Sequence, residues 1–373
     1  MLAAMSRPPI PEPRLHTMRN VTPFSAFQCD KMAPGRKFYD IMVVKGTFTL
    51  APGKLELAKE QREVALADDH WELDAPVRAS LKQPGDALLL KPSTDVIITG
   101  TARPPGKEPR CAWDAAIVVR GRGETVLEYR AQVLGPRRWR HRGEGGWALT
   151  DPEPTGEVPI RYELAYGGAY PAAAPPEGEP EPPWVVHAPN PSGTGFFDEG
   201  AMDPGVEYRA PQWQPHAHPV TDMNREVPLT GFGPIARPWS SRLRFAGTYD
   251  EAWERATRID VENGLPADYA ADFDPRLFQC AHPDLIARSY LKGDEEITLT
   301  GVVPGEDPFT MRLPDKRVEA RLFDGKGGSH GGRMLLDTVH IDVDEGVVYV
   351  CWRITLDQGR DIRTALIFST EGA

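Results

Sequence analysis

Proline and glycine are the residues that most constrain the fold of this chain. The 373 residues include 38 prolines and 35 glycines, spread along the sequence rather than gathered in one tail. Proline interrupts helices because it lacks an N–H and fixes φ, and both residues punctuate short strands. We therefore predict a mainly β fold, with antiparallel β-sandwich-like sheets, long ordered loops and two or three short helices.

Composition narrows the class of protein further. Hydrophobic residues make up 40% and charged residues 26%, which suits a packed core and excludes wholesale disorder. The formal charge of −11 repels phosphate backbones, so we expect no nucleic-acid partner. We find no secretory signal at the N-terminus and no apolar run long enough to span a bilayer, so we expect a cytoplasmic protein without membrane contact.

The distribution of turns and strands predicts five regions. We expect a flexible leader at 1–20, an N-terminal β lobe at 21–170, a proline-rich loop or linker at 171–183, a loop-rich region with short helices at 184–295, and a C-terminal β lobe at 296–373. The two lobes are expected to pack together as one unit.

Residues 38–50 are expected to form a long central strand, because they are rich in β-branched and aromatic residues with apolar groups on both faces. Lys45 lies in the middle of this strand and must pair, snorkel or face a groove. The strongest hairpin signal is 335–356, with its turn at 344–346. Further strands are predicted at 95–103, 115–120, 125–134, 296–303 and 317–323.

Two helices are predicted. Thr248 and Glu251 have capping-box spacing ahead of a helix over 251–258. A second helix is predicted to begin at Pro283 and to stop at Gly293. The glycine-rich stretch 325–332 lacks the spacing of a phosphate-binding loop, so we expect a mobile hairpin loop there.

Chemistry-bearing motifs are weak. His216 and His218 have too few neighbouring ligands for a structural zinc site, and the acidic turn around Asp344 lacks the spacing of a calcium loop. We find no nucleophile motif, so we expect no catalytic residue, no metal and no cofactor. The four scattered cysteines are expected to be small buried apolar groups in a reducing compartment. The basic cluster 137–142 predicts a solvated turn after a strand, with a patch for an acidic partner as the alternative.

Four tryptophans fall in the irregular middle of the chain, namely Trp184, Trp213, Trp239 and Trp253. Large aromatic side chains in ordered loops either wedge the loops onto a sheet or form hot spots for a partner. We favour the packing interpretation and keep the contact interpretation open.

Short motifs follow one another in a consistent order between about residues 20 and 305. They occupy 22–25, 43–48, Gln61, 91–96 with Gly100, 135–139, 159–162, 165–168, 190–196, 231–235, Trp239, Arg242, 247–250, Trp253, 272–276 and 293–295. In these motifs the chain resembles a bacterial domain-of-unknown-function family whose members act as type VI secretion effector adaptors, often encoded beside the spike protein VgrG, a PAAR tip or an effector. It departs from the family pattern by extra residues between 266 and 272, and by Gln279-Cys280 where an asparagine is expected.

The resemblance implies a non-enzymatic adaptor or chaperone that binds a secretion effector protein and helps load it onto the VgrG or PAAR spike. The family-motif positions, with structural or partner-binding roles, are Lys45, Thr47, Lys91, Asp95, Trp139, Tyr162, Asn190, Gly193, Trp239, Arg242, Trp253 and Asp274. For Lys45 and 91–95 we weigh an internal lysine–carboxylate pairing against a binding groove. One rival is a carbohydrate-active or hydrolytic β-sandwich enzyme, with two carboxylates within about 10 Å of each other in an aromatic-flanked pocket. Another is a secreted structural component of the apparatus.

Overall fold

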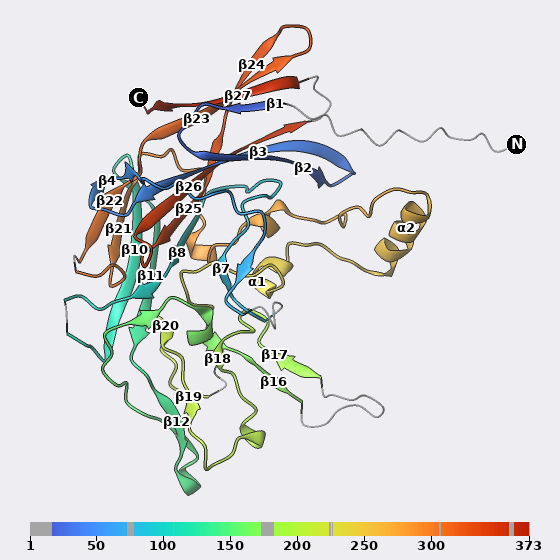
Figure 1. Ribbon diagram of the computed structural model, residues 1–373. Helices are drawn as coiled ribbons and strands as arrows, with labels where there is room; N and C mark the ends of the chain where they lie inside the picture. The colour runs from blue at the N-terminus through green and yellow to red at the C-terminus, as the bar shows by residue number, and fades with distance from the viewer. Residues whose placement is uncertain are drawn as a thin grey trace, which may run out of the picture.

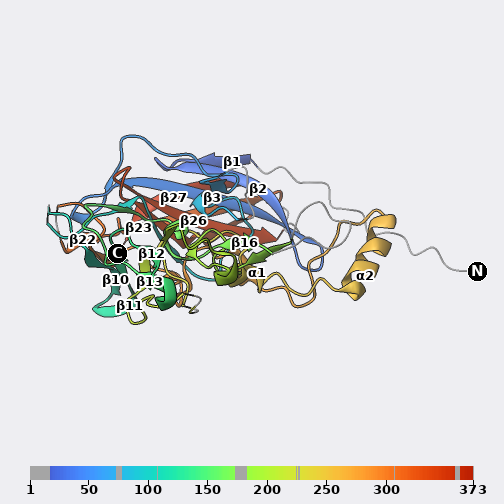
Figure 2. The same cartoon turned by 90° about the horizontal axis from the view of Figure 1, so that it is seen from below.

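A computed structural model describes residues 17–72, 78–106, 108–172, 183–223, 225, 227–305, 307–357 and 362–372. The fold is mainly β, as predicted, and it contains mixed as well as antiparallel sheets (Figure 1). The loop-rich middle of the chain extends from one end of the sheets, and one helix stands away from them (Figures 1 and 2). Within the described part of the chain, no helix combines the length and the apolar character needed to cross a membrane.

The first large sheet combines strands from both ends of the chain. Its order is β2 (Ser25–Ala33), β3 (Lys37–Thr49), β26 (Val347–Asp357), β25 (Leu335–Asp342) and β8 (Asp95–Thr99), with β5 (Glu56–Leu57) also paired to β3. Strand β8 runs parallel to β25, and the other pairings in this sheet are antiparallel. The predicted long strand and the predicted hairpin are therefore confirmed, and they lie side by side.

Two further sheets complete the β-rich body. The second six-stranded sheet has the order β20 (Trp213–Pro215), β11 (Glu124–Leu134), β10 (Ala112–Gly121), β21 (Glu296–Thr300), β22 (Phe309–Arg312) and β4 (Gly53–Lys54). The four-stranded sheet has the order β1 (Thr17–Asn20), β27 (Ile362–Glu371), β23 (Lys316–Asp324) and β24 (Ser329–Arg333). In all three sheets, strands from the first half of the chain pair with strands from its last third.

Small sheets and turns organise the rest. The small sheets pair β12 (Arg138–His141) with β13 (Trp147–Leu149) and β19 (Tyr208–Arg209), β14 (Val158–Pro159) with β9 (Thr101–Ala102), β15 (Tyr166–Gly167) with β18 (Thr194–Gly195), β16 (Ala169–Pro171) with β17 (Trp184–Val186), and β6 (Asp69–His70) with β7 (Leu81–Gln83). The α-helices are α1 (Ser240–Leu243) and α2 (Glu251–Glu262). Single 3-10 turns lie at Gly143–Gly145, Tyr162–Leu164, Glu199–Ala201, Pro275–Phe278 and Pro283–Leu285.

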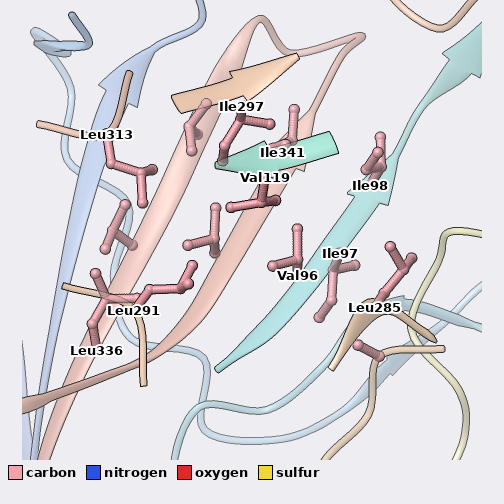
Figure 3. Packing of buried hydrophobic residues seen from close by; sticks show 14 of the residues in the cluster. Val96, Ile97, Ile98, Val119, Leu285, Leu291, Ile297, Leu313, Leu336 and Ile341 are labelled. Atoms are coloured by element: carbon pink, nitrogen blue, oxygen red, sulfur yellow. The ribbon is translucent and has the colours of Figure 1, made fainter. Parts of the chain in front are cut away.

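The core lies between the sheets, and several long strands contribute alternate residues to it, whereas β8 contributes Val96, Ile97 and Ile98 in succession. Along β3, Met42 and Val44 belong to the main cluster, whereas Ile41 and Val43 face a smaller cluster on the other side. This alternation is the period of two that a strand imposes, and it explains why β3 is apolar on both faces. In the main cluster, side chains from β8, β10, β21 and β25 converge (Figure 3). Burying each of these large aliphatic side chains contributes roughly 1.5–3 kcal/mol.

Several local predictions were wrong for physical reasons. The segment predicted as a helix from Pro283 makes only one 3-10 turn, because the residues after it pair with the start of β8: Ala287 N donates to Thr94 O at 2.9 Å. The predicted strand 95–103 is broken at Gly100, whose φ of 109° favours glycine. Helix α2 is confirmed, but its N-cap is Asp250, not the predicted capping box.

Three other predicted segments can be compared with the structure only in part or have shifted boundaries. Residues 17–20 of the expected leader form β1, which runs parallel to β27, and residues 1–16 lie outside the described residues. Within the glycine-rich stretch 325–332, residues from Ser329 onward belong to β24, so the hairpin turn is shorter than predicted. Most of the proline-rich stretch, 173–182, lies outside the described residues, and the strands that flank it, β16 and β17, pair with each other.

Candidate functional site

Lys45 is held by an internal carboxylate. Its side chain leaves β3 on a sheet face that is covered by the loop before β8, where its Nζ lies 2.9 Å from Asp86 Oδ2. Both side chains are almost fully buried, and the Lys45 ammonium also lies over the Tyr349 ring. Asp86 Oδ2 also accepts a hydrogen bond from Ala65 N at 2.8 Å. The pair therefore ties β3 to two loops.

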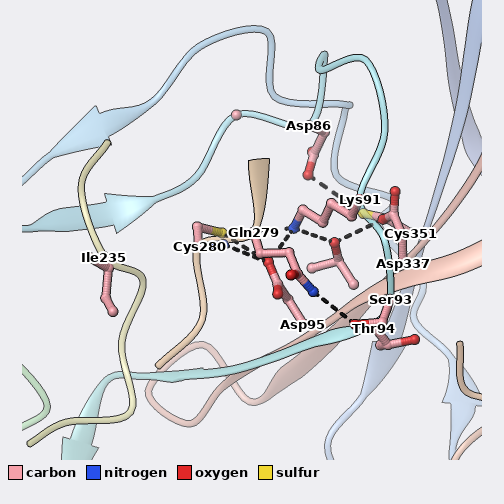
Figure 4. A network of polar contacts seen from close by, with 12 residues as sticks. Asp86, Lys91, Ser93, Thr94, Asp95, Ile235, Gln279, Cys280, Asp337 and Cys351 are labelled. Carbon is pink, nitrogen blue, oxygen red and sulfur yellow. Dashed lines mark hydrogen bonds and ion pairs between the residues drawn. The ribbon is translucent and has the colours of Figure 1, made fainter. Parts of the chain in front are cut away.

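Lys91 and Asp95 form a second buried pair, and Lys91 lies at the centre of the network in Figure 4. Lys91 Nζ lies 2.8 Å from Asp95 Oδ2 and donates to Thr338 Oγ1 at 2.8 Å. Asp95 Oδ2 also accepts hydrogen bonds from the Cys280 backbone N at 2.8 Å and from its thiol at 3.4 Å. Strand β8, strand β25 and the loop at 279–281 therefore meet at one ion pair.

Asp337 and Arg353 extend the network on the hairpin β25–β26, and neither was predicted from the sequence. Asp337 accepts from Thr338 Oγ1 at 2.9 Å and from Arg353 Nε at 2.5 Å. Arg353 also donates to Leu88 O at 2.9 Å. The sequence offered only a weak signal, an aspartate and an arginine on two strands that were predicted to pair.

Burial sets the protonation of these groups. Burial has the largest single effect on Lys91 and lowers its pKa, but the charge of Asp95, the charge of Asp337 and the hydrogen bond to Asp95 act together in the opposite direction. The pKa is therefore raised, and the ammonium persists at neutral pH. Burial raises the pKa of Cys280 to about 12, and burial followed by the Asp86 charge raises the pKa of Cys351 well above its ordinary value. Both thiols are thus hydrogen-bond donors and poor nucleophiles at neutral pH.

The cysteine prediction holds only in part. Cys280 and Cys351 are buried, but each contacts a carboxylate, so neither is merely a small apolar group. Cys29 is half-buried and Cys111 is exposed.

His340 adds a neutral buried base to this sheet. Its Nε2 lies 2.7 Å from Thr99 Oγ1. Burial, followed by the positive charge of Lys45, lowers the pKa of His340 to about 3. The imidazole is therefore uncharged at neutral pH, which is the form that a site beside two ammonium groups favours.

Thr47 and Arg242 anchor loops through backbone groups. The Gln61 side chain binds both backbone groups of Thr47 in β3. Thr47 N donates to Gln61 Oε1, and Gln61 Nε2 donates to Thr47 O, each at 2.9 Å. Arg242, on α1, is buried and donates to Ile235 O at 2.7 Å and to Leu277 O at 2.8 and 3.1 Å. Its guanidinium supplies hydrogen-bond donors to these loop carbonyls, which regular secondary structure would otherwise provide.

Tyr162, Asn190, Gly193 and Trp239 form the interior of the loop-rich region. Asn190 Nδ2 donates to Tyr162 O at 2.8 Å and to Tyr166 O at 3.1 Å. Tyr162 packs edge-to-face on Trp239 with ring centroids 5.3 Å apart. Gly193 is required by close approach, since a Cβ there would lie 2.6 Å from Gly167 Cα. The side chains of Tyr162, Asn190 and Trp239 are buried, so they order the loops from within.

The remaining candidate positions are dispersed. Trp139 is buried on β12 in a separate cluster, whereas Trp253 lies half-buried on α2. Asp274 forms an ion pair with Arg276 and caps a 3-10 turn. The structure thus brings Lys45, Lys91 and Asp95 together with Thr47 on one sheet, and it places the other candidates elsewhere.

The tryptophans divide between the two interpretations. Trp213 and Trp239 are fully buried, and Trp213 Nε1 donates to Pro159 O at 2.7 Å. Trp184 on β17 is 47% exposed and has Arg78 over its ring. The packing interpretation therefore holds for the two buried side chains, and the surface leaves Trp184 accessible.

The weaker motifs also find partners. His216 lies 3.3 Å from Asp114, Asp344 pairs with Arg103, and Asp342 accepts a hydrogen bond from Glu345 N within its turn. Among the described residues, no group of three or more His, Cys, Asp or Glu is arranged to hold a metal ion. The basic cluster 137–142 was predicted as a turn but contains strand β12, whose arginines lie beside Glu207.

Two surface depressions lie outside the network. One, of about 450 Å³, is lined by Asp68, His70, Arg237 and neighbouring apolar residues. The other, of about 420 Å³, is lined by Lys54, Arg120, Arg122, Gly123, Asp294, Glu296, Arg312 and Asp315. The second depression is lined by four basic and three acidic side chains and by no aromatic side chain.

Fold and network together define a class: a β-rich scaffold whose motif residues bind one another in the interior. The chain belongs to the bacterial family described as "uncharacterized protein conserved in bacteria (DUF2169)", which matches residues 36–353. No curated protein and no solved structure matches the chain. The matched region contains every candidate position from Lys45 to Asp274, so the internal network is part of the region that the family shares.

Proposed function

We propose that this protein is a non-enzymatic adaptor, or chaperone, that binds a type VI secretion effector in the cytoplasm and helps load it onto the VgrG or PAAR spike. The observation that carries the proposal is that the motif residues are buried and bind other parts of the same chain. Lys45, Lys91, Asp95, Asn190 and Arg242 are buried, and each binds another part of the same chain through its side chain, although Asp95 Oδ1 and Asn190 Oδ1 have no hydrogen-bond partner among the described residues. Such residues maintain a shape, which is what a binding scaffold requires.

The ordered loops supply the second support. Segments with little regular structure are fixed by buried donors, such as Asn190 and Arg242, that satisfy loop carbonyls. Loops fixed in this way keep a large surface in one conformation before a partner arrives, which lowers the entropic cost of binding.

The rival hydrolytic enzyme is less well supported. It requires two carboxylates in an aromatic-flanked pocket. The depression that holds Asp294, Glu296 and Asp315 lacks the aromatic lining, and four basic side chains line it beside those carboxylates. We therefore favour the adaptor.

Co-expression tests the proposal. The tagged full chain is expressed with the effector and the VgrG protein encoded by neighbouring genes, and captured proteins are identified by mass spectrometry; an effector from an unrelated gene cluster is the control. The adaptor predicts capture of the neighbouring effector and no capture of the control. Recovery of neither the effector nor the spike protein would contradict it, as would substrate turnover that one side-chain change in a depression abolishes. Detection of the chain among the secreted proteins would favour a structural component of the apparatus.

A further inference from the structure

Helix α2 stands at the tip of a projection that we call the α2 arm, residues 249–272, well away from the sheets (Figures 1 and 2). The arm is fixed at defined points. Thr248 N donates to Asp272 Oδ1 at 2.7 Å at its base, and Gly35 N, in the turn between β2 and β3, donates to Asp268 Oδ1 at 3.0 Å. Arg36 in the same turn forms an ion pair with Asp260. The arm therefore has a preferred orientation.

From outside the arm, helix α2 is held by the ion pair between Arg36 and Asp260. None of its residues is buried. Its inner face rests on the arm itself: Trp253 Nε1 donates to Asp268 O at 3.1 Å, and the Trp253 ring packs edge-to-face on Tyr249 with centroids 4.6 Å apart. A 12-residue helix is marginal in water by itself, so these contacts maintain a helix whose outer face is left free.

That outer face is apolar at its centre. Ala252, Ala256 and Ile259 are spaced four and three residues apart, so they share one side of the helix, and all three are exposed. Ile259 is 58% exposed, whereas Val261, which is 55% exposed, lies on the opposite side of the helix because residues two apart do not share a face. Large aliphatic side chains on a protruding, preorganised helix are typical of helix-in-groove recognition.

The charge of the arm identifies the chemistry of its partner. Residues 249–272 contain seven Asp or Glu and two Arg, a formal charge of −5 in a chain whose total is −11. Glu251 and Glu262, near the two ends of α2, have no ion-pair partner within the described part of the chain. An acidic helix is repelled by nucleic acid and by anionic lipid, and it is attracted to a basic protein surface.

We propose that the α2 arm is the effector-docking element, and that its outer face inserts into an apolar groove with a basic rim on the effector. This inference rests on the proposed adaptor function and adds the surface and the partner chemistry. Ion pairs at the rim would speed association, and Ile259 would anchor the centre.

The test measures the affinity of the purified full chain for the effector encoded by the neighbouring gene. Ala256→Arg places bulk and positive charge on the outer face while keeping a good helix former, and E251K combined with E262K reverses the rim. We expect each change to weaken binding at least tenfold, and the charge reversal to reduce the salt dependence of binding. Val206→Arg, at an exposed position outside the arm, is the matched control and should stay within twofold of wild type. Circular dichroism and thermal unfolding establish that each variant is folded.

The outcomes separate the two proposals. If wild type binds the effector and folded Ala256→Arg binds it equally well, the docking inference is wrong while the adaptor stands. If wild type binds no effector, the adaptor function fails and the inference fails with it. Loss of spike binding alone would also overturn the inference, as would a wild-type dimer, detected by light scattering, that Ala256→Arg converts to a monomer.

Discussion

The buried network around Lys91 and the α2 arm place charge in opposite ways. In the network, each lysine meets a carboxylate within 3 Å and the side chains are nearly inaccessible. On the arm, acidic side chains outnumber basic ones and the helix has no buried residue. The first arrangement fixes the positions of loops on a sheet, and the second leaves charge and apolar surface available to another molecule. Stability and recognition are thereby assigned to different regions.

The largest expected effect comes from breaking a buried pair. Lys91→Met leaves the Asp95 carboxylate buried without its counter-ion, which we expect to lower the free energy of unfolding by about 3–5 kcal/mol. Denaturant unfolding measures the loss. Lys91→Met combined with Asp95→Asn removes both charges and retains an acceptor for Cys280 N, so it should be clearly less destabilising than the single change. Equal losses for the single and double variants would show that the ion pair is not the source of the effect.

A smaller loss is expected in the loop-rich interior. Asn190→Ala removes the buried side-chain amide that donates to the carbonyl groups of Tyr162 and Tyr166, which should cost about 1–3 kcal/mol in unfolding free energy. Asn263→Ala, at the exposed C-terminal end of α2, is the matched control and should change stability by less than about 0.5 kcal/mol. A stable Asn190→Ala protein would mean that the loops are held by other contacts.

The pH dependence of stability should report His340. Its pKa in the folded state is lowered to about 3 from an ordinary value of 6.5, so the unfolded state binds a proton more readily between those values. The contribution of His340 is therefore fully present above pH 6.5 and is lost as pH falls, with a slope of up to about 1.4 kcal/mol per pH unit. His340→Gln should remove one proton from the measured slope. Burial also lowers the pKa of His282, so a residual slope of the same sign is expected in that variant.

The smallest effect on stability is expected on the arm. Ile259→Ser removes an exposed side chain and should change the free energy of unfolding by less than about 0.5 kcal/mol. Leu336→Ser, in the main core, is the contrasting control and should cost several times more. A large loss for Ile259→Ser would indicate that the arm packs on the body, and the contrast between the two regions would disappear.

The sequence predicted elements better than it predicted their partners. Strand β3 and the hairpin β25–β26 were predictable because their apolar residues follow the period of a strand. The parallel pairing of β1 with β27 joins the two ends of the chain, and no local pattern encodes it. The helix expected from Pro283 was wrong because pairing with the start of β8 overrides local helix propensity.

The candidate site shows the same limit. The sequence indicated that Lys45 needed a partner, but it did not identify Asp86, which lies 41 residues away in a loop. Lys91 and Asp95 were recognised together because they share one short motif. Asp337 and Arg353 were missed, since on sequence alone they resembled ordinary polar positions in a hairpin. The tertiary fold, and not the residue type alone, determines which charged side chains form ion pairs.

The most direct test of the account is the effector affinity of the Lys91→Met, Asp95→Asn double variant, measured by calorimetry beside wild type once folding has been established. If the motif residues serve only to fix the scaffold, both proteins should bind the neighbouring effector with affinities within about twofold, a difference below 0.5 kcal/mol. A folded double variant that has lost tenfold or more in affinity would contradict the account, because the pair would then belong to the binding surface.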